Sequence, residues 1–489
     1  MPMNYDEVPY IRLTYAESHP DRLATVATLF GLVPPEVATC RVLELGCASG
    51  DNLCAMAVGM PTASFTGLDY SPRQIEQATQ LARQLKLENV SFRCVDMAEV
   101  SDSWGQFDYI IAHGLYSWVE KPLQDKLLSI CRGNLQPNGV AYVSYNVLPG
   151  WQMRGIVRDI MRLHTYHSPD GLTGARQLVD LLAKHSKPDS AYGVMLRAES
   201  KHIREQPDAY LLHDYLEETN DAVYFQEFVA SAQEHQLQYL GDAEFRSMLQ
   251  SDVPTPVAEV LNKTTRDLLV MEQYLDFFRN RIFRRSLLVH KEVEINRALS
   301  SRSVEKLTVT SLARTLSLKG KMQTYGTPEG GTISTDNALL KAAVRELITR
   351  GERGLPFVQL LAVVKSAVNE TASDPTERLA TNLIEGYAQG VFGLHAWTPP
   401  IALSPGDQPL ASSWARYQAE GGETVTNLRH TTISLDRFQR DLLKLLDGTR
   451  TRAVLSAQLA KDSRVPPRQM SDQVDAALQK FVQFGLMLG

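Results

Sequence analysis

The stretch RVLELGCASGDNLCAM, residues 41–56, joins an apolar segment to a helix through a turn of small residues. We predict a strand over 41–45, a turn over 46–50 and a helix that starts near Asp51. Glycine at positions 46 and 50 permits a left-handed backbone and lets a ligand approach the main chain closely. The amide groups of the first helical turn point toward the same place. This arrangement predicts a binding site for a nucleotide-type ligand at the end of the strand.

The turn differs from the G-x-G-x-x-G fingerprint that binds dinucleotides. In GCASGD, residues 46–51, alanine and aspartate occupy the second and third glycine positions. An acid in the first helical turn also disfavours a pyrophosphate, because both groups are negative. We therefore expect a ligand with a cationic centre and no phosphates, and S-adenosylmethionine is such a ligand.

Residues 40–147 alternate between strand-like and helix-like segments. Further strands are predicted in FTGLD, VSFRCVD, FDYIIAH and PNGVAYVSYNV. The segment SPRQIEQATQLARQL between them is predicted to be a helix, with Ser71 as N-cap, Pro72 at the first position and Gln74 completing a capping box. Strands that alternate with helices predict an α/β fold with a parallel, doubly wound sheet.

Two later strands, near Gln238–Leu240 and Ser286–Val289, are expected to complete this sheet. The polar helical stretch over 150–222 would then interrupt the sheet as a helical insertion. The expected fold class is a Rossmann-like, doubly wound sheet of seven strands, followed by a mostly α-helical C-terminal region.

Two segments beyond residue 300, 339–361 and 438–460, are similar to each other. Each has an apolar helix, a glycine turn and a second apolar helix, and each is later followed by Phe-Gly-Leu. This pattern predicts two winged-helix-like units, joined by a linker over 398–413 that is rich in proline and serine. The stretch KGKMQTYGTPEGGTISTDN, residues 319–337, is predicted to be a loop.

The composition limits the cellular setting and the partners. The 489-residue chain has five cysteines and no CxxC pair, which favours buried thiols in a reducing cytosol and no metal site. The net charge of −6 disfavours nucleic acid as a partner. No run of 18 apolar residues occurs, and the N-terminal segment lacks the pattern of a secretory signal. We therefore expect a cytoplasmic protein without a membrane contact.

Two more acids end the second and third predicted strands, as Glu44 comes near the end of the first. Asp69 would accept hydrogen bonds from both ribose hydroxyls of the ligand, and Asp96 from the adenine amino group, while the residues that follow them would pack on the adenine. Together with the glycine turn, these positions resemble the cofactor site of class I S-adenosylmethionine-dependent methyltransferases. The expected cofactor-binding residues are Glu44, Gly46, Cys47, Ala48, Gly50, Asn52, Asp69, Tyr70, Asp96, Met97, His113 and Gly114.

The resemblance extends to methyltransferases that carry a methyltransferase regulatory domain. It rests on NYDEVPY, HPDRLATVATLFG, AHGLYSWV and SYNVLPGW, and on YLLHDYLEETNDAVYFQEF for the regulatory domain. The best-understood relatives are protein lysine methyltransferases that act on bacterial outer-membrane proteins. The resemblance implies a protein substrate, such as an outer-membrane protein before export, and a homodimer. It divides the chain into a cofactor core with an N-terminal cap (1–149), a helical insertion for dimerisation (150–222), a regulatory domain that completes the sheet (223–295), and two winged-helix-like domains, middle (296–400) and C-terminal (401–489).

The acceptor would lie at the carboxyl ends of the fourth and fifth strands, where ligands bind in open α/β sheets. Carbonyl and tyrosine hydroxyl groups there would accept from an incoming amine, and aromatic faces would stabilise its methylated cation. The histidine among them is equally well explained as a structural residue, and the two tryptophans as packing residues. No Asn-Pro-Pro-Tyr motif is present, which disfavours adenine or glutamine amide acceptors. The catalytic candidates are His113, Tyr116, Trp118, Tyr145, Asn146 and Trp151.

Three other groups allow two interpretations each. The N-terminal stretch Tyr5–His19, with three tyrosines, would fold over the cofactor as a lid or pack on the sheet as a strap. The group His213, Asp214 and Glu217 has a spacing only superficially like that of metal ligands, and we expect a solvated helix face. A basic cluster would bind nucleic acid or an acidic partner, or would be solvated or ion-paired; it comprises Arg279, Arg281, Arg284, Arg285 and Lys291.

The leading hypothesis is an enzyme that N-methylates lysine side chains of a protein, and two alternatives stay open. One is a small-molecule methyltransferase, although a small acceptor needs no platform of two winged units. The other is a nucleic-acid-binding regulator with a vestigial cofactor pocket. The acidity of the chain and the complete set of Glu44, Asp69 and Asp96 argue against it, while salt-dependent DNA binding would favour it.

Overall fold

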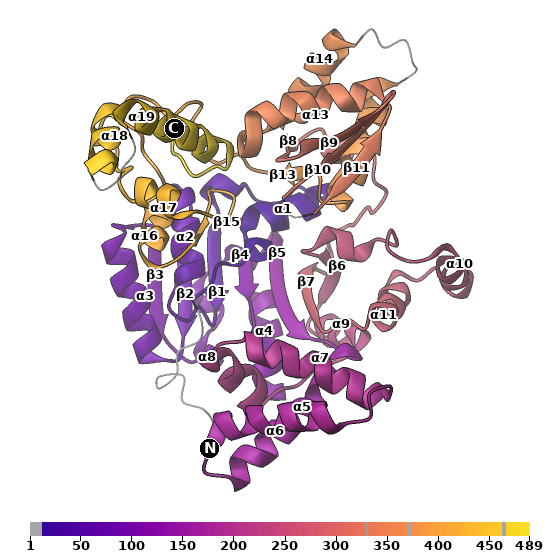
Figure 1. Ribbon diagram of the computed structural model, residues 1–489. Coiled ribbons are helices and arrows are strands. Elements are labelled where there is room, and N and C mark those ends of the chain that lie inside the picture. Colours follow the sequence, from indigo (N-terminus) through magenta and orange to yellow (C-terminus); the bar gives the residue numbers. More distant parts are fainter. Residues whose placement is uncertain (1–11, 329, 369–373, 462–465) are drawn as a thin grey trace.

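The centre of the protein is a seven-stranded sheet with the strand order β3-β2-β1-β4-β5-β7-β6 (Figure 1). The structure is a computed structural model that describes residues 12–328, 330–368, 374–461 and 466–489. β7 runs antiparallel to both neighbours, and all other pairs are parallel. The strands are β1 (Arg41–Leu45), β2 (Ser64–Asp69), β3 (Val90–Cys94), β4 (Phe107–Ala112), β5 (Leu135–Asn146), β6 (Leu237–Asp242) and β7 (Phe283–His290).

Helices cover both faces of this sheet, as a doubly wound fold requires. Successive residues of β4 point to opposite faces: Tyr109 and Ile111 pack with α1 and α2, whereas Ile110 and Ala112 pack with α4 and α9. The predicted fold class is therefore confirmed. The helices around the sheet are α1 (Pro20–Leu29), α2 (Asp51–Gly59), α3 (Pro72–Gln84), α4 (Lys121–Gly133), α9 (Phe225–Glu234), α10 (Thr255–Thr264) and α11 (Leu268–Arg279).

The two late strands, β6 and β7, complete the sheet as predicted, and a buried ion network holds them to α11. Arg284 on β7 is 0% exposed. Its guanidinium donates to both carboxylate oxygens of Asp276, at 2.8 and 2.9 Å, and to Oε2 of Glu272 at 2.8 Å. Arg281 pairs with Asp242 at 2.8 Å. The predicted basic cluster is thus largely ion-paired, because a buried guanidinium requires a charged partner.

The stretch between β5 and β6 is a helical insertion with a core of its own (Figure 1). Val157, Met161, Val179 and Leu196 pack at its centre. It consists of α5 (Gly150–His167), α6 (Gly171–His185), α7 (Ala191–Glu205), α8 (Asp208–Leu211) and a π-helical turn, η6 (Leu212–Leu216). Among the described residues, no helix is long and apolar enough to cross a membrane.

The middle region departs from the prediction at residues 319–337, which are not a loop. They contribute to an antiparallel meander of β9 (Arg314–Lys319), β10 (Met322–Gly326) and β11 (Thr332–Thr335). Threonines and isoleucine favour strands here, and Gly320 supplies the tight turn with a φ of 60°. The unit around it contains α12 (Ser301–Val304), β8 (Thr308–Thr310), α13 (Ala338–Arg350), β12 (Leu355–Pro356), α14 (Phe357–Ala367), α15 (Pro375–Ala388) and β13 (Gly393–His395).

The C-terminal region lies over the α2 and α3 side of the sheet (Figure 1). Trp414 packs there against Cys54 and Ala55 of α2. The linker over 398–413 is held in place, since Ile401 and Ala411 form bridges with Leu488 and Met487. The elements are α16 (Ser413–Gly421), β14 (Thr424–Thr426), β15 (Thr432–Ser434), α17 (Arg437–Lys444), α18 (Arg452–Lys461) and α19 (Pro467–Gln483).

Candidate active site

The glycine turn after β1 has the left-handed backbone that the sequence predicts. Gly46 and Gly50 have φ values of 72° and 75°, and Ala48 between them has a φ of 46°. A Cβ atom on Gly50 would lie 2.6 Å from the ring of Phe92, so only glycine fits. The turn therefore passes directly into α2 and leaves the backbone amides of its small residues at the carboxyl edge of the sheet.

Glu44 ends β1 beneath this turn, and it is buried. Its Oε1 accepts a hydrogen bond of 2.7 Å from Nδ2 of Asn52, whereas its Oε2 is buried without a partner among the described residues. Burial, with Asp69 and Asp51 nearby, raises the pKa of the Glu44 carboxyl to about 8. An unpaired, buried carboxyl oxygen is costly, so this atom fits a cationic or hydrogen-bond-donating ligand group.

The two other predicted acids lie along the same edge. Asp69 accepts at 3.0 Å from the backbone amides of Ala48 and Ser71, which fixes the turn against the end of β2. Asp96 follows β3 and accepts from the amide of Ala98 at 2.8 Å. The bond to Asp96 leaves lone pairs of this carboxylate available. Tyr70 is 60% exposed beside them, and Met97 is buried.

These residues fit S-adenosylmethionine. The carboxyl edge from β1 to β3 presents three acids in the order that an amino-acid moiety, a ribose and an adenine would require, and the buried Oε2 of Glu44 matches an ammonium group. When bound, the cofactor supplies an electrophilic methyl group on a sulfonium. We expect the positive charges of this ligand to be stabilised by the acidic edge without any metal ion.

We predict that the cofactor displaces a proton from Glu44 when it binds. The carboxyl, with a pKa near 8, is mostly protonated at pH 7, and an adjacent ammonium lowers its pKa. The release should approach one proton per site near pH 7 and vanish well above pH 8, where the carboxyl is already ionised. Calorimetric titration in two buffers of different ionisation enthalpy measures this number. Glu44→Gln is the control for protons from the ligand itself, and equal proton release by both proteins would contradict the prediction.

His113 lies at the end of β4, and its imidazole is stacked on Tyr15 with a centroid distance of 3.6 Å. Its Nδ1 shares a hydrogen bond of 2.8 Å with the hydroxyl of Tyr142. Burial lowers the pKa of His113 to about 3. The ring is therefore neutral at physiological pH and a poor acceptor for the proton of an amine. Gly114 follows it, exposed, with a φ of 62°.

Tyr116 and Tyr145 come together, but in the apolar core beneath the strand ends. Each is 1% exposed, and both rings pack against Phe228 of α9. The hydroxyl of Tyr145 is hydrogen-bonded to Ser286 at 2.9 Å. In this arrangement they are packing residues for the regulatory segment, and their predicted contact with an amine stays a prediction.

Trp118 and Trp151 meet in a T-shaped pair with a centroid distance of 6.4 Å. The guanidinium of Arg154 lies over Trp151, 5.3 Å from the ring centroid, so Trp151 already has one cation on its surface. Asn146, at the end of β5, is buried, and its Nδ2 lacks a hydrogen-bond partner among the described residues. The structure thus places these three candidates at the carboxyl ends of β4 and β5, as predicted.

The expectation of a solvated helix face for His213, Asp214 and Glu217 is wrong. All three are buried, and the first two lie in the π-helical turn η6. Their separations along the chain fit a regular exposed helix, but the wider turn directs them inward, and π-helical turns are frequent at functional sites. Within the described ranges, no group of three or more His, Cys, Asp or Glu residues could hold a metal ion.

Tyr15 and Arg12 are site residues that sequence patterns did not reveal as such. The ring of Tyr15 covers His113, and burial raises the pKa of its hydroxyl, with charges from Glu44, Asp214 and Asp51 adding to the effect. Arg12 pairs with Asp51 at 2.9 Å. These contacts agree with both the lid and the strap interpretation of Tyr5–His19, of which residues 1–11 lie outside the described part.

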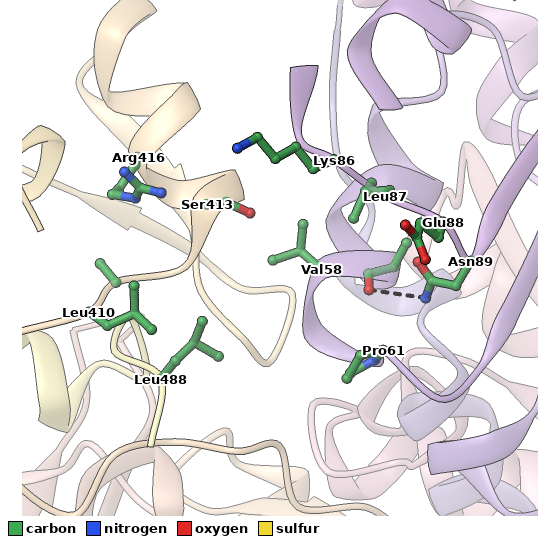
Figure 2. A pocket seen from close by; sticks show the side chains of 12 residues that line it. Val58, Pro61, Lys86, Leu87, Glu88, Asn89, Leu410, Ser413, Arg416 and Leu488 are labelled. Carbon is green, nitrogen blue, oxygen red and sulfur yellow. Dashed lines mark hydrogen bonds between the residues drawn. The ribbon is translucent and has the colours of Figure 1, made fainter. Parts of the chain in front are cut away.

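A groove of about 360 Å³ separates the edge of α2 and α3 from the C-terminal region. Figure 2 shows Lys86 and Arg416 on opposite walls at one end, with Val58 and Leu488 among the apolar residues farther in. None of the predicted site residues lines it. The groove is therefore separate from the carboxyl edge of the sheet.

The sheet, its strand order and the acidic edge define an S-adenosylmethionine-dependent methyltransferase of class I. Three families match parts of the chain. They are described as a methyltransferase domain over residues 36–198, a predicted methyltransferase regulatory domain over 207–290, and a PKMT C-terminal winged helix domain over 407–480. The predictions of the enzyme class, of its cofactor and of the regulatory domain are confirmed.

Comparison with individual proteins identifies the family. The chain is 35% identical over 468 residues to Uncharacterized protein RP789 of Rickettsia prowazekii, covering 91% of this chain and 83% of that protein. It is similar to the structure of PKMT2 from Rickettsia typhi in complex with AdoHcy, with a TM-score of 0.87, 30% identity, and coverage of 98% of this chain and 100% of that chain. The protein belongs to the family of RP789 and PKMT2.

Proposed function

We propose that this protein transfers methyl groups from S-adenosylmethionine to lysine side chains of a protein substrate. The observation that carries the proposal is the similarity to PKMT2 over 98% of the chain, far beyond the cofactor sheet. The similarity includes the helical insertion and the two C-terminal units. An enzyme with a small-molecule acceptor would not need these parts.

The acceptor would enter between the ends of β4 and β5 and the turn η6. Asp214 and Glu217 lie buried on that side, and the Oε2 atom of Glu217 lacks a hydrogen-bond partner among the described residues. These carboxylates would attract a lysine ammonium and would by themselves keep it protonated. Desolvation by Trp118 and Trp151 would oppose this effect, because it lowers the pKa of the lysine and favours loss of its proton. Alignment of the free amine then accounts for catalysis, because the displacement itself needs little more than positioning.

The roles of the other candidates follow from their surroundings. His113 would shape the floor of the site together with Tyr15, and the unpartnered Nδ2 of Asn146 would donate to a carbonyl of the acceptor peptide, because the lone pair of the amine must face the methyl group. Tyr116 and Tyr145 would act through the packing of the strand ends. A neutral His113 is a weak base, so we assign proton loss to desolvation of the lysine and transfer to water rather than to this imidazole.

An outer-membrane protein in the cytoplasm, before export, is the proposed substrate class. The test is incubation of the purified protein with methyl-labelled S-adenosylmethionine and unfolded bacterial outer-membrane proteins, followed by peptide mass spectrometry. Label on lysine in the wild type and none with Asp69→Ala would support the proposal. Label confined to small molecules would refute it in favour of a metabolite acceptor.

We further propose that the insertion is the homodimer interface. Met153, Ile156, Leu163 and Tyr166 are exposed on α5, between 42 and 85%, and lie 3, 7 and 3 residues apart, which places them on one side of the helix. Light scattering should give twice the chain mass of 54.6 kDa. Leu163→Lys should yield monomers, while Val260→Lys, an equally exposed site on α10, should not. A monomeric wild type would refute this interface.

A further inference from the structure

His430 is a side chain of the C-terminal region that reaches the cofactor site. This residue lies in the turn between β14 and β15 and is 3% exposed. Its backbone is left-handed, with a φ of 63°, a conformation that costs less for glycine than for any other residue. The turn is held by Asn427, whose side chain accepts from the amides of Arg429 and Thr431 at 2.9 and 2.8 Å. The geometry of this turn therefore fixes the position of the His430 imidazole.

The imidazole of His430 contacts Asn52, which lies in the first turn of α2. Nε2 of His430 lies 2.8 Å from Oδ1 of Asn52. Nδ2 of Asn52 in turn donates to Oε1 of Glu44 at 2.7 Å. A chain of two hydrogen bonds therefore joins the C-terminal region to the buried acid at the end of β1, and the first of them spans 378 positions of sequence.

The direction of these bonds follows from the chemistry of an amide. Oδ1 of Asn52 also accepts from the backbone amide of Tyr15 at 3.1 Å, and Nδ2 also donates to Oγ of Ser18 at 3.1 Å. The oxygen must therefore face the donors, and the nitrogen must face Glu44. His430 supplies one of the two donors, so it carries its proton on Nε2. Without His430 the oxygen would keep a single donor, and the amide could turn away from Glu44.

We propose that His430 is a positioning residue of the cofactor site, which holds the amide of Asn52 and thereby orients Glu44 toward the amino group of S-adenosylmethionine. The inference rests on the proposed function only for the identity of the ligand. It gives the C-terminal region a role in cofactor binding, because cofactor affinity then depends on whether this region is docked on α2. A substrate that displaces the C-terminal region from α2 would change the affinity of the protein for S-adenosylmethionine.

The test compares three variants of the full-length protein by calorimetric titration with S-adenosylmethionine from pH 6 to 9. His430→Ala should weaken binding about tenfold, as expected for one buried hydrogen bond, and should shift the pH dependence of binding upward, because Glu44 would lose the donor that helps it ionise. His430→Gln keeps an amide donor and should stay within about threefold of the wild type. His395→Ala is the matched control, since His395 also lies between regions, half-buried, but bonds to Asp21 at 2.7 Å.

Hydrogen exchange of residues 45–58 without cofactor provides a second readout. His430→Ala should speed exchange there, and His395→Ala should not. Wild-type affinity and pH dependence in His430→Ala, or an equal loss in both alanine variants, would overturn the inference. If the wild type does not bind the cofactor, the proposed function fails, and the exchange comparison still decides whether His430 positions the start of α2.

Discussion

Asp69→Ala is expected to remove detectable micromolar binding of S-adenosylmethionine. We expect the carboxylate to accept from both ribose hydroxyls, and hydrogen bonds to a charged group contribute about 1.5–3 kcal/mol each. Loss of two corresponds to a decrease in affinity of at least about 100-fold. The same side chain accepts from the amide of Ala48 at 3.0 Å, so its removal also loosens the glycine turn. Calorimetric titration measures the loss directly.

Asp108→Ala provides the matched control for this variant. Asp108 lies near the amino end of β4, at the opposite edge of the sheet, and also accepts from a backbone amide, that of Arg41 at 2.7 Å. We expect its affinity for the cofactor to stay within about twofold of the wild type, since it cannot reach the ligand. Unchanged binding by a folded Asp69→Ala protein would show that the ribose lies elsewhere.

Arg284→Met should destabilise the sheet by about 3–5 kcal/mol, because it leaves buried carboxylates without their cation. Asp276 and Glu272 each lie 2.8 Å from this guanidinium, and Asp242 lies 3.8 Å away. All three are buried with it. Burial already raises the pKa of Glu272 against the opposing effect of Arg284, so without the arginine its carboxyl should be protonated. Chemical denaturation followed by tryptophan fluorescence measures the effect.

The neighbouring Arg285 on β7 is the control. Its side chain is 26% exposed and pairs with Glu244 at 3.4 Å. A pair of this kind contributes about 1 kcal/mol or less, so Arg285→Met should shift the unfolding midpoint little. Equal destabilisation by the two variants would mean that loss of packing on β7, rather than unpaired charge, dominates.

The core sheet could be predicted because its signals are local. The strand, glycine turn and helix at 41–56 are adjacent in sequence, and the cap of α3 at Ser71 and Pro72 is an interaction within one turn. The acids Glu44, Asp69 and Asp96 were found for the same reason, since each lies at or just after the carboxyl end of a strand. The error at 319–337 has a local cause as well: the segment has four glycines, and two of them close turns between the strands of a meander.

The contacts that complete the site could not be predicted, because they join distant segments. Asn52 was expected to bind the cofactor, but nothing near it in sequence indicates a partner at position 430. Tyr15 and His113 are far apart in the sequence and stack only because the N-terminal segment crosses the ends of β1 and β4. The side of η6 that is buried depends on a π-helical turn, which has no reliable sequence signal.

The insertion of β7 between β5 and β6 has a consequence for synthesis on the ribosome. β5 pairs with β7 through residues 141–146, and β7 begins only at Phe283, after the whole insertion and α9–α11. At translation rates of about 5–20 residues per second, the edge of β5 that pairs with β7 stays unpaired for roughly 7–27 s. An open apolar strand edge recruits other strands in that interval. We therefore expect the nascent chain to depend on chaperones until residue 290 has left the exit tunnel, and aggregation during expression to fall when translation beyond residue 150 is made faster.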